Sequence, residues 1–429
     1  MLIRVQYKNL LSFNDVVEFN MLPNLKRQNL PSHIINRDQL PLLKMAAVYG
    51  PNGSGKSNLV KGLKFLRAFV TQKDYINMLK SEGDFDRLFF SLRKNIQPFE
   101  ILVEFSTSNN YFIYHIQISQ KGVDLEELYQ SGIGKNENVL IFKREGDKFS
   151  APTAPSAELS SAILSLLRKN RFSSLMSLNE SFPLLSDNRA SMAFKWFKNR
   201  LTIYDINTRI PALLELLHNN KRILDFTNNI FNKLGLGIDN LSINEEDYEN
   251  WASKHQMLSV PLTPQERQNG KISLFRNQTQ AYTVIQNKVY SFLFKQRGEN
   301  GYEGFLDAIS QSDGTIKLLS LIPAIYDCIN KDKTVVIDEI NNCLHPSIVE
   351  GITKLFANND KSKGQLVFTT HDIELLGVKD VLRSDEIWFT DKKNGGTIMY
   401  PHSIFKEHNT LSILRGYKEG RYGAIKYID

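Results

Sequence analysis

Alternating hydrophobic and polar positions open the chain and predict strands. Residues 3–7 alternate apolar and polar side chains, and residues 17–19 repeat the pattern after a short turn. A period of two indicates a strand with one buried face. Residues 45–49 form a continuous apolar run, which indicates a buried strand, whereas residues 23–39 are polar and contain proline. We therefore predict two strands joined by a turn, then a loop and a third strand.

A helical period follows this third strand. Apolar residues recur every three or four positions over residues 59–70, and this spacing returns over residues 157–234. Between them, residues 101–143 contain three alternating segments, which are typical of an antiparallel sheet. No heptad pattern persists over several repeats, so we expect a compact helical lobe and no long coiled-coil arm. Residues 245–270 are polar and irregular, and we predict a loop there.

The octet that follows residues 45–49 has the pattern of a phosphate-binding loop. It consists of Gly50, Pro51, Asn52, Gly53, Ser54, Gly55, Lys56 and Ser57, and Asn58 follows it. Glycines let the backbone approach phosphate oxygens, and amides at a helix N-terminus present positive partial charge to them. Lys56 would contact the β- and γ-phosphates, and Ser57 would bind Mg²⁺ through its hydroxyl. The loop alone does not distinguish a GTPase from a kinase, a helicase or an ABC ATPase.

Two later strands end in polar residues. Residues 334–337 are β-branched and lead into Asp338 and Glu339, the Walker B arrangement. The aspartate would hold the metal shell, and the adjacent glutamate would polarise water. Residues 367–370 form a similar strand that ends at His371, whose imidazole can donate to a γ-phosphate. Either strand end taken alone has an ordinary structural explanation as a solvated terminus.

A third segment resembles a degenerate ABC signature. Ser312, Asp313 and Gly314 precede an apolar stretch over residues 316–329, so a serine and a glycine stand at a helix start. Alone, this would be a turn with a helix cap. We expect Pro323 to kink or interrupt the helix. The order of P-loop, signature, Walker B and histidine favours an ABC-type ATPase, because a GTPase has no use for the signature or the histidine.

Together with these motifs, residues 9–13, 338–346 and 420–425 resemble the stand-alone ABC-type ATPases of prokaryotic anti-phage systems. This group includes the RloA and AriA ATPases and the ATPase half of the OLD proteins. The resemblance covers residues 1 to about 120 and about 300 to 429 and is weak between them. It implies a head related to the structural-maintenance-of-chromosomes ATPases, ATP and Mg²⁺ as ligands, and a partner effector, often a nuclease.

The predicted fold class is thus α/β, an ABC-type P-loop head with an antiparallel β subdomain and an inserted helical lobe. Residues 1–155 would form the first part of the head, with the P-loop and the β subdomain. Residues 156–300 would form the helical lobe. Residues 301–429 would complete the head with the signature, Walker B and the switch histidine.

The resemblance also implies a composite site between two copies of the chain. In ABC ATPases the signature of one copy caps the γ-phosphate held by the P-loop of another. We therefore expect an ATP-dependent homodimer or higher homo-oligomer in which Ser312 and Gly314 act in trans. Glu339 would serve as general base, Asp338 would act on Mg²⁺, and His371 would sense the γ-phosphate.

Composition and charge limit the expected partners, location and cysteine chemistry of the protein. The 429 residues carry a net charge of +7 that is spread along the chain, so a nucleic-acid partner is possible. No apolar run reaches the roughly 18 to 20 residues of a membrane helix, and no signal peptide opens the chain, so we expect a cytoplasmic protein without a membrane partner. The two cysteines, Cys328 and Cys343, form no paired motif, which argues against a disulfide framework and a zinc site.

Three roles remain open: a sensor in antiviral defence that controls a nuclease or toxin, a RecF-like DNA-repair ATPase, and a self-contained nuclease. Against the last, the 58 residues after His371 contain no Asp-x-Asp. Arg27 and His33 have the R-x5-H spacing of HEPN ribonucleases, but Pro31 disfavours the required helix. Gln97 is a candidate for the Q-loop glutamine. The sequence names neither the trigger nor the effector.

Overall fold

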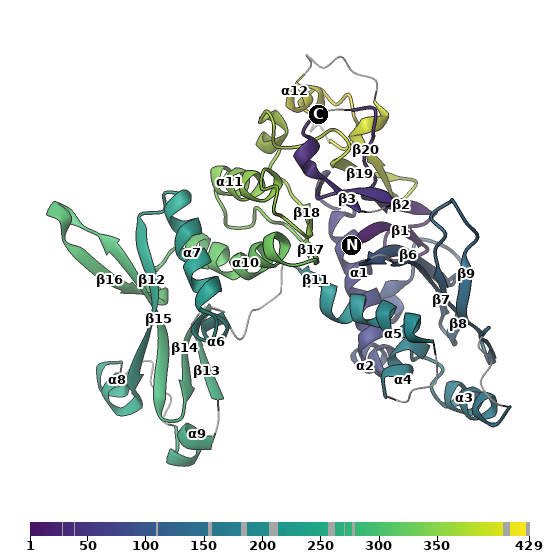
Figure 1. The fold of residues 1–429 in the computed structure, drawn as a ribbon, viewed down its shortest axis with the longest axis horizontal. Helices are drawn as coiled ribbons and strands as arrows, with labels where there is room; N and C mark the ends of the chain where they lie inside the picture. Colours follow the sequence, from purple (N-terminus) through teal and green to yellow (C-terminus); the bar gives the residue numbers. More distant parts are fainter. Residues whose placement is uncertain are drawn as a thin grey trace. The chain divides into compact units, whose positions relative to one another are not determined.

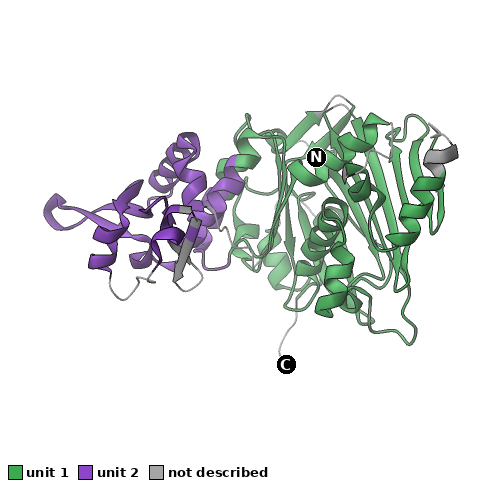
Figure 2. Ribbon diagram, turned by 90° about the horizontal axis from the view of Figure 1, so that it is seen from below, with its two compact units in different colours: residues 1–206, 327–341, 353–429 green, residues 207–326, 342–352 purple. Residues whose placement is uncertain are grey.

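The computed structural model describes residues 1–27, 29–37, 39–108, 110–152, 157–181, 187–205, 213–255, 262–269, 271–276, 279–405 and 412–425. The chain divides into two compact units (Figure 2). Unit 1 comprises Met1–Ile206, Asp327–Asn341 and Thr353–Asp429, and unit 2 comprises Asn207–Tyr326 and Asn342–Ile352. Unit 1 is therefore assembled from segments far apart in the sequence, whereas the two segments of unit 2 are separated by a short stretch.

A six-stranded sheet carries the candidate site in unit 1, with the order β11-β17-β18-β5-β19-β20. Its strands are β5 (Met45–Tyr49), β11 (Leu201–Tyr204), β17 (Thr334–Ile337), β18 (Gln365–Thr369), β19 (Ile387–Lys393) and β20 (Gly396–Pro401). All neighbours pair in parallel except β20, which is antiparallel to β19. Every residue of β5, β17 and β18 is buried, as expected for strands covered on both faces.

An antiparallel sheet of seven strands, in the order β10-β9-β8-β7-β6-β1-β2, completes the β structure around the core of unit 1 (Figure 1). Its strands are β1 (Leu2–Lys8), β2 (Val17–Asn20), β6 (Phe99–Thr107), β7 (Asn110–Ser119), β8 (Gly122–Gln130), β9 (Val139–Glu145) and β10 (Lys148–Ser150). The predicted α/β class with an antiparallel β subdomain is confirmed. The two opening strands, β1 and β2, belong to that subdomain.

Helix α1 (Lys56–Thr71) follows the P-loop and contributes its apolar face to a core shared by both sheets. The other helices with residues in unit 1 are α2 (Tyr75–Glu82), α3 (Ala157–Lys169), α4 (Leu175–Ser181), α5 (Asn188–Lys195), α11 (Pro346–Ala357) and α12 (Ile413–Lys418). Aromatic stacking joins the helical segment to the sheet, because the Trp196 and Phe105 rings lie 4.3 Å apart. Among the described residues, no helix has the length and hydrophobicity needed to cross a membrane.

Unit 2 contains a five-stranded antiparallel sheet that the sequence analysis did not predict. The strands are β12 (Ile238–Asp247), β13 (Lys271–Arg276), β14 (Thr279–Ile285), β15 (Lys288–Arg297) and β16 (Glu303–Asp307). The helices are α6 (Leu213–His218), α7 (Lys221–Lys233), α8 (Tyr248–Lys254) and α9 (Pro264–Asn269), and α10 (Asp313–Asn330) spans the boundary with unit 1. Residues 156–300 thus contain the predicted helices and, in addition, most of a sheet.

Two local predictions differ from the structure. The segment predicted as a loop over residues 245–270 includes the end of β12, α8 and α9, and residues 256–261 and 270 lie outside the described residues. Pairing with β15, and not its own hydrophobic pattern, makes β12 a strand. Helix α10 continues through Pro323, where we expected a kink or an interruption.

The predicted loop over residues 23–39 also contains regular structure. It holds a short 3-10 helix, Pro31–His33, and the strand β3 (Ile34–Arg37), which pairs with β4 (Leu40–Leu43). Strand β11 was not predicted either, because it lies inside a segment whose spacing is otherwise helical. These elements are short, and their neighbours in the fold supply most of their stabilisation.

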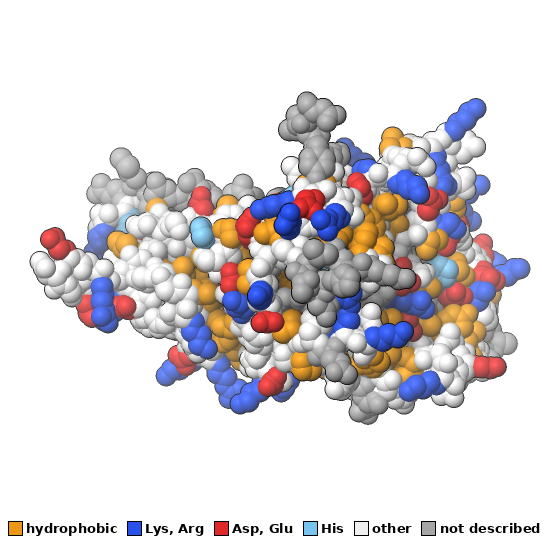
Figure 3. All heavy atoms as spheres, turned by 90° about the horizontal axis from the view of Figure 1, so that it is seen from above, with side chains coloured by type: hydrophobic (Ala, Val, Ile, Leu, Met, Phe, Trp, Pro, Cys, Tyr) orange, Lys and Arg blue, Asp and Glu red, His pale blue; other side chains and the backbone are white. Residues whose placement is uncertain are grey.

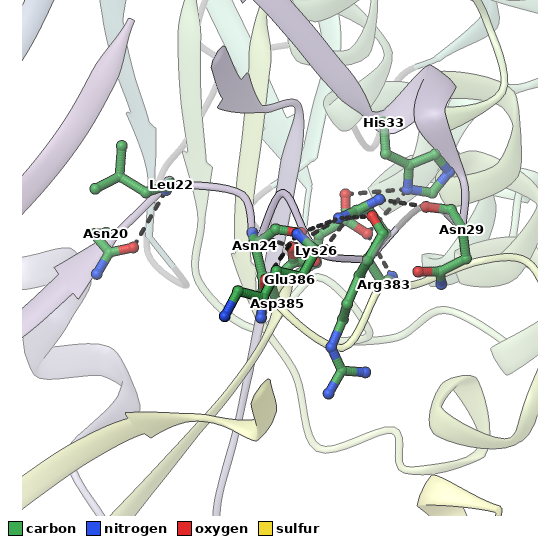
Figure 4. A network of polar contacts seen from close by, with 10 residues as sticks. Asn20, Leu22, Asn24, Lys26, Asn29, His33, Arg383, Asp385 and Glu386 are labelled. Carbon is green, nitrogen blue, oxygen red and sulfur yellow. Dashed lines mark hydrogen bonds and ion pairs between the residues drawn. The ribbon is translucent and has the colours of Figure 1, made fainter. Parts of the chain in front are cut away.

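A buried polar network fastens the segment before β3 to the turn before β19 (Figure 4). The Arg383 guanidinium donates to both carboxylate oxygens of Asp385, at 2.9 and 2.8 Å, and also bonds to the Asn29 carbonyl. His33 Nδ1 lies 2.9 Å from a carboxylate oxygen of Glu386, and both side chains are fully buried. Burial raises the pKa of Glu386, and His33 acts in the opposite direction.

This network accounts for His33, the histidine of the R-x5-H spacing. His33 is the buried partner of a glutamate, so its ring cannot contact an RNA substrate. The helix that contains Pro31 and His33 is only three residues long. The HEPN reading therefore has no support in the fold.

We predict that Arg383→Met lowers the free energy of unfolding by about 3 to 5 kcal/mol, because it leaves the Asp385 charge buried without its guanidinium partner. Urea denaturation followed by circular dichroism measures the change. Arg87→Met is the matched control, because its pair with Asp84 is exposed on both sides and should contribute less than about 1 kcal/mol. Equal effects of the two substitutions would contradict the prediction.

Candidate nucleotide-binding site

Three separate segments of unit 1 line one cavity of about 660 Å³. The lining residues are Asn52, Gly53, Gly55, Lys56, Ser57 and Asn58 from the loop after β5, Glu339 from the turn after β17, and His371 from the turn after β18. These strands are parallel neighbours, so their carboxyl ends meet at one edge of the sheet. The structure therefore brings together the P-loop, Walker B and histidine segments.

The glycines of the loop have conformations that other residues rarely adopt. Gly53 and Gly55 have φ angles of 74° and 110°, and Gly55 immediately precedes α1. A side chain on Gly50 would collide with Thr390, and one on Gly55 would collide with Thr397. Glycine at these positions lets the loop lie tightly against the β19–β20 hairpin.

Hydroxyl groups hold the loop against this hairpin. Ser54 Oγ lies 2.6 Å from Thr390 Oγ1, and Thr397 Oγ1 donates to the Ser54 carbonyl at 2.7 Å. Thr397 also contacts Ser12 at 2.7 Å, and the Asn58 amide donates to Ser12 Oγ at 2.6 Å. The sequence analysis did not assign Ser12, Thr390 or Thr397 to the site. Of these three residues, only Ser12 could have been found from the sequence, because it lies in the segment 9–13 that carries part of the family resemblance.

Lys56 is the cation of the cavity and is largely buried. Its ammonium donates to the carbonyl oxygens of Gly50 at 2.7 Å and Pro51 at 3.2 Å. Burial lowers the pKa of Lys56 to about 8, and the carboxylates of Glu339 and Asp338 oppose the shift. Burial thus lowers the pKa of this amine well below the usual value for lysine.

The turn after β17 presents Asp338 buried and Glu339 half-buried. Thr369 Oγ1 donates to Asp338 Oδ1 at 2.6 Å, and the Glu339 amide donates to the same hydroxyl at 2.8 Å. Glu339 has a φ of 51°, a left-handed conformation that is uncommon outside glycine. This conformation accompanies a turn in which the glutamate side chain lines the cavity.

His371 lies beside the glutamate, with its Nε2 atom 3.5 Å from Glu339 Oε1. The Asn341 side-chain oxygen accepts hydrogen bonds from the His371 backbone amide at 3.2 Å and the Thr370 hydroxyl at 3.0 Å. Neither Thr369 nor Asn341 was assigned a role from the sequence, because their partners become neighbours only through the pairing of β17 with β18.

The predicted signature residues belong to unit 2 and are absent from the described lining of the cavity. Ser312 Oγ accepts a hydrogen bond from the Thr315 amide at 3.2 Å, as a helix cap does, and Asp313 begins α10. A side chain on Gly314 would lie 2.8 Å from the Cys343 carbonyl, so glycine fits a close approach there. Gln97 is exposed and does not line the cavity among the described residues.

Residues 45–377 match the protein family described as "AAA domain, putative AbiEii toxin, Type IV TA system". The chain belongs to this AAA family. The matched range contains the P-loop, the signature segment, Walker B and His371, so it spans both units. The family assignment and the arrangement of these motifs support an ATPase of the ABC-like P-loop class.

Solved structures similar to this AAA chain include heads of SMC proteins. The SMC head domain from Thermotoga maritima has 13% identity and a TM-score of 0.41, with 93% of this chain and 98% of that chain covered. An Smc head bound to the C-winged helix domain of ScpA has 14% identity and a TM-score of 0.45, with 97% and 99% covered. A third similar structure is the Smc head domain with an extended coiled coil, bound to the C-terminal domain of ScpA derived from Pyrococcus furiosus. It has 12% identity and a TM-score of 0.43, with 98% of each chain covered. No curated protein matches the chain.

Ser57 lines the cavity, and Asp338 precedes the lining residue Glu339 without belonging to the described lining; their oxygens fit Mg²⁺ with a nucleotide. A serine hydroxyl and a carboxylate are the hard oxygen ligands that Mg²⁺ accepts, and one or two protein ligands suffice where phosphates supply others. Among the described residues, no group of three or more His, Cys, Asp or Glu is placed to hold a metal ion.

We predict that ATP binds with a dissociation constant that is nearly constant up to pH 8 and rises above it by up to about tenfold per pH unit. The free Lys56 amine has a pKa of about 8 and the phosphates stabilise its charged form, so binding above that pH must take up a proton. Calorimetric titration between pH 7.5 and 9.5 measures the effect. Lys56→Ala should bind weakly with no such dependence, and normal affinity in that variant would overturn the assignment.

Proposed function

We propose that the chain binds and hydrolyses Mg-ATP and that its nucleotide state switches a partner protein. The observation that carries this proposal is the convergence of Lys56, Glu339 and His371 on one cavity, with the imidazole 3.5 Å from the glutamate carboxylate. A cation for phosphate, a carboxylate for water and a donor for the γ-phosphate are the groups that phosphoryl transfer to water requires. The left-handed backbone of Glu339 supports a role beyond packing.

Each side chain has a distinct role in this proposal. Lys56 and the amides at the start of α1 bind the phosphates. Glu339 accepts a proton from the attacking water, and His371 donates to the γ-phosphate. Mg²⁺, held through Ser57 and Asp338, would neutralise charge on the β- and γ-phosphates.

We further propose that hydrolysis takes place in a homodimer or higher homo-oligomer. Ser312, Asp313 and Gly314 stand at the start of α10, where the helix dipole favours an anion. They belong to unit 2, whereas the P-loop belongs to unit 1. In the ABC arrangement, these residues of one copy cap the γ-phosphate bound to another, so that ATP holds the two copies together.

The partner in this proposal is an effector protein, a nuclease or toxin of an anti-phage system. The description of the family names a toxin and a type IV toxin–antitoxin system, which supports a defence role. The resemblance of the motifs to the RloA and AriA ATPases points the same way. On the face shown in Figure 3, Lys and Arg side chains are interspersed with Asp and Glu. The RecF-like DNA-binding role is the alternative to this proposal.

We predict that Glu339→Gln binds ATP normally and lowers turnover by about 10²- to 10⁴-fold, because glutamine has the size of glutamate but cannot accept the proton. The bound nucleotide should then trap the closed dimer. Size-resolved mass measurement with ATP, alongside phosphate release, tests both parts. Hydrolysis at the normal rate would show that another residue is the base.

The trans arrangement generates a separate prediction. Ser312→Arg and Glu339→Gln subunits should each be nearly inactive alone, because every composite site then carries one defect. In a mixed dimer both defects fall in one site and the other site is intact, so phosphate release should return on mixing. Full activity of Ser312→Arg alone would remove the signature assignment. Mixing two Glu339→Gln preparations is the control and should restore nothing.

A further inference from the structure

Thr369, the last residue of β18, bonds to three consecutive residues of the turn after β17. Its hydroxyl accepts from the Glu339 amide at 2.8 Å and donates to Asp338 Oδ1 at 2.6 Å. Its carbonyl accepts from the Ile340 amide at 3.1 Å. Thr369 is fully buried and is absent from the described lining of the cavity. A single side chain thus connects the two acidic residues of Walker B.

The direction of these bonds follows from the atoms involved. A backbone amide can only donate, so the hydroxyl oxygen must accept from Glu339. The hydroxyl has one proton, and the Asp338 carboxylate receives it. The hydrogen bond to Asp338 fixes the rotation of its carboxylate, and the hydrogen bond from the Glu339 amide fixes the backbone of Glu339.

The hydrogen bond from the Glu339 amide matters because the Glu339 backbone is in a left-handed conformation, with a φ of 51°. Residues with a Cβ adopt this conformation only where the surroundings impose it. In the ladder between β17 and β18, Ile337 is level with Phe368, so Thr369 is the next residue along, beside the turn. Beyond the end of the regular ladder, the Thr369 hydroxyl accepts a hydrogen bond from the Glu339 amide. This hydrogen bond holds Glu339 beside His371.

We propose that Thr369 is a positioning residue for ATP hydrolysis, which orients the Glu339 base through its hydroxyl without touching the nucleotide. This inference rests on the proposed function, in which Glu339 is the base. A threonine that only satisfied a buried strand end would affect stability and not the catalytic step.

Thr369→Val tests the proposal, because valine keeps the shape of threonine and lacks the hydroxyl. The expected result is a fall in kcat of about 10- to 100-fold, the usual effect of removing a group that orients a catalytic ligand. The dissociation constant for Mg-ATP should change by less than about threefold, because the P-loop is untouched. Thr369→Ser restores the hydroxyl and should return kcat to within about threefold of the wild-type value.

Thr334→Val is the matched control. Thr334 is equally buried and begins β17, at the opposite end of the strand from Asp338. Its hydroxyl also makes two hydrogen bonds, from the Leu2 amide at 3.2 Å and to the Gln365 side chain at 3.0 Å. Its removal should lower the melting temperature and leave kcat unchanged.

A double substitution distinguishes action through Glu339 from a general disturbance. In the Glu339→Gln background, Thr369→Val should reduce the remaining turnover by less than about threefold, because the base that it orients is already absent. Additive losses would overturn the proposal. If valine prevents folding, Thr369→Ala provides the same test with less steric demand.

The outcomes of these experiments distinguish a failure of the positioning role of Thr369 from a failure of the proposed ATPase function. If Glu339→Gln is inactive and Thr369→Val retains the wild-type kcat, the ATPase assignment stands and the positioning role is wrong. A loss in Thr334→Val as large as in Thr369→Val, or no recovery in Thr369→Ser, would also overturn the positioning role. A wild-type protein that binds but never hydrolyses ATP would overturn the proposed function and this inference together.

Discussion

The parallel pairing of β5, β18 and β17 is the constraint on which the candidate site depends. Each strand is followed by a different polar segment, and parallel pairing brings the three segments to the same edge of the sheet. Because all residues of these strands are buried, the sheet cannot slip by one residue without turning apolar side chains toward the wrong layer. The pairing of these strands therefore fixes where the segments that carry Lys56 and Glu339 lie along the edge of the sheet.

This constraint explains what could be predicted from the sequence. The P-loop needs local glycines, a strand before it and a helix after it, and all of these lie within one short stretch. Asp338 and His371 could be found because each follows a β-branched run whose strand character is evident without its neighbours. The antiparallel β subdomain was found for the same reason, since alternation is a local signal.

The parts that could not be predicted depend on contacts between distant residues. Thr390 and Thr397 reach Ser54 across 336 and 343 positions of the chain, and their surroundings in the sequence resemble an ordinary hairpin. Strand β12 of unit 2 could not be predicted because it has few apolar residues and is a strand through its pairing with β15. Strand β15 is rich in apolar and aromatic residues, so its local signal was overlooked. Likewise, α10 passes through Pro323, although a proline inside a helix removes one hydrogen bond, because the residues around the proline, 321 to 325, are all buried.

The C-terminal tail is connected to the nucleotide loop through the β19–β20 hairpin. Thr390 contacts Ser54, and the adjacent Asp391 accepts a hydrogen bond from the Ala424 amide at 3.1 Å. The Tyr400 hydroxyl donates to the Tyr422 carbonyl at 2.6 Å. Within the same strand, then, one residue holds the P-loop and the next holds the segment 420–425. A tail that left this hairpin would remove support from the strand that the loop packs against.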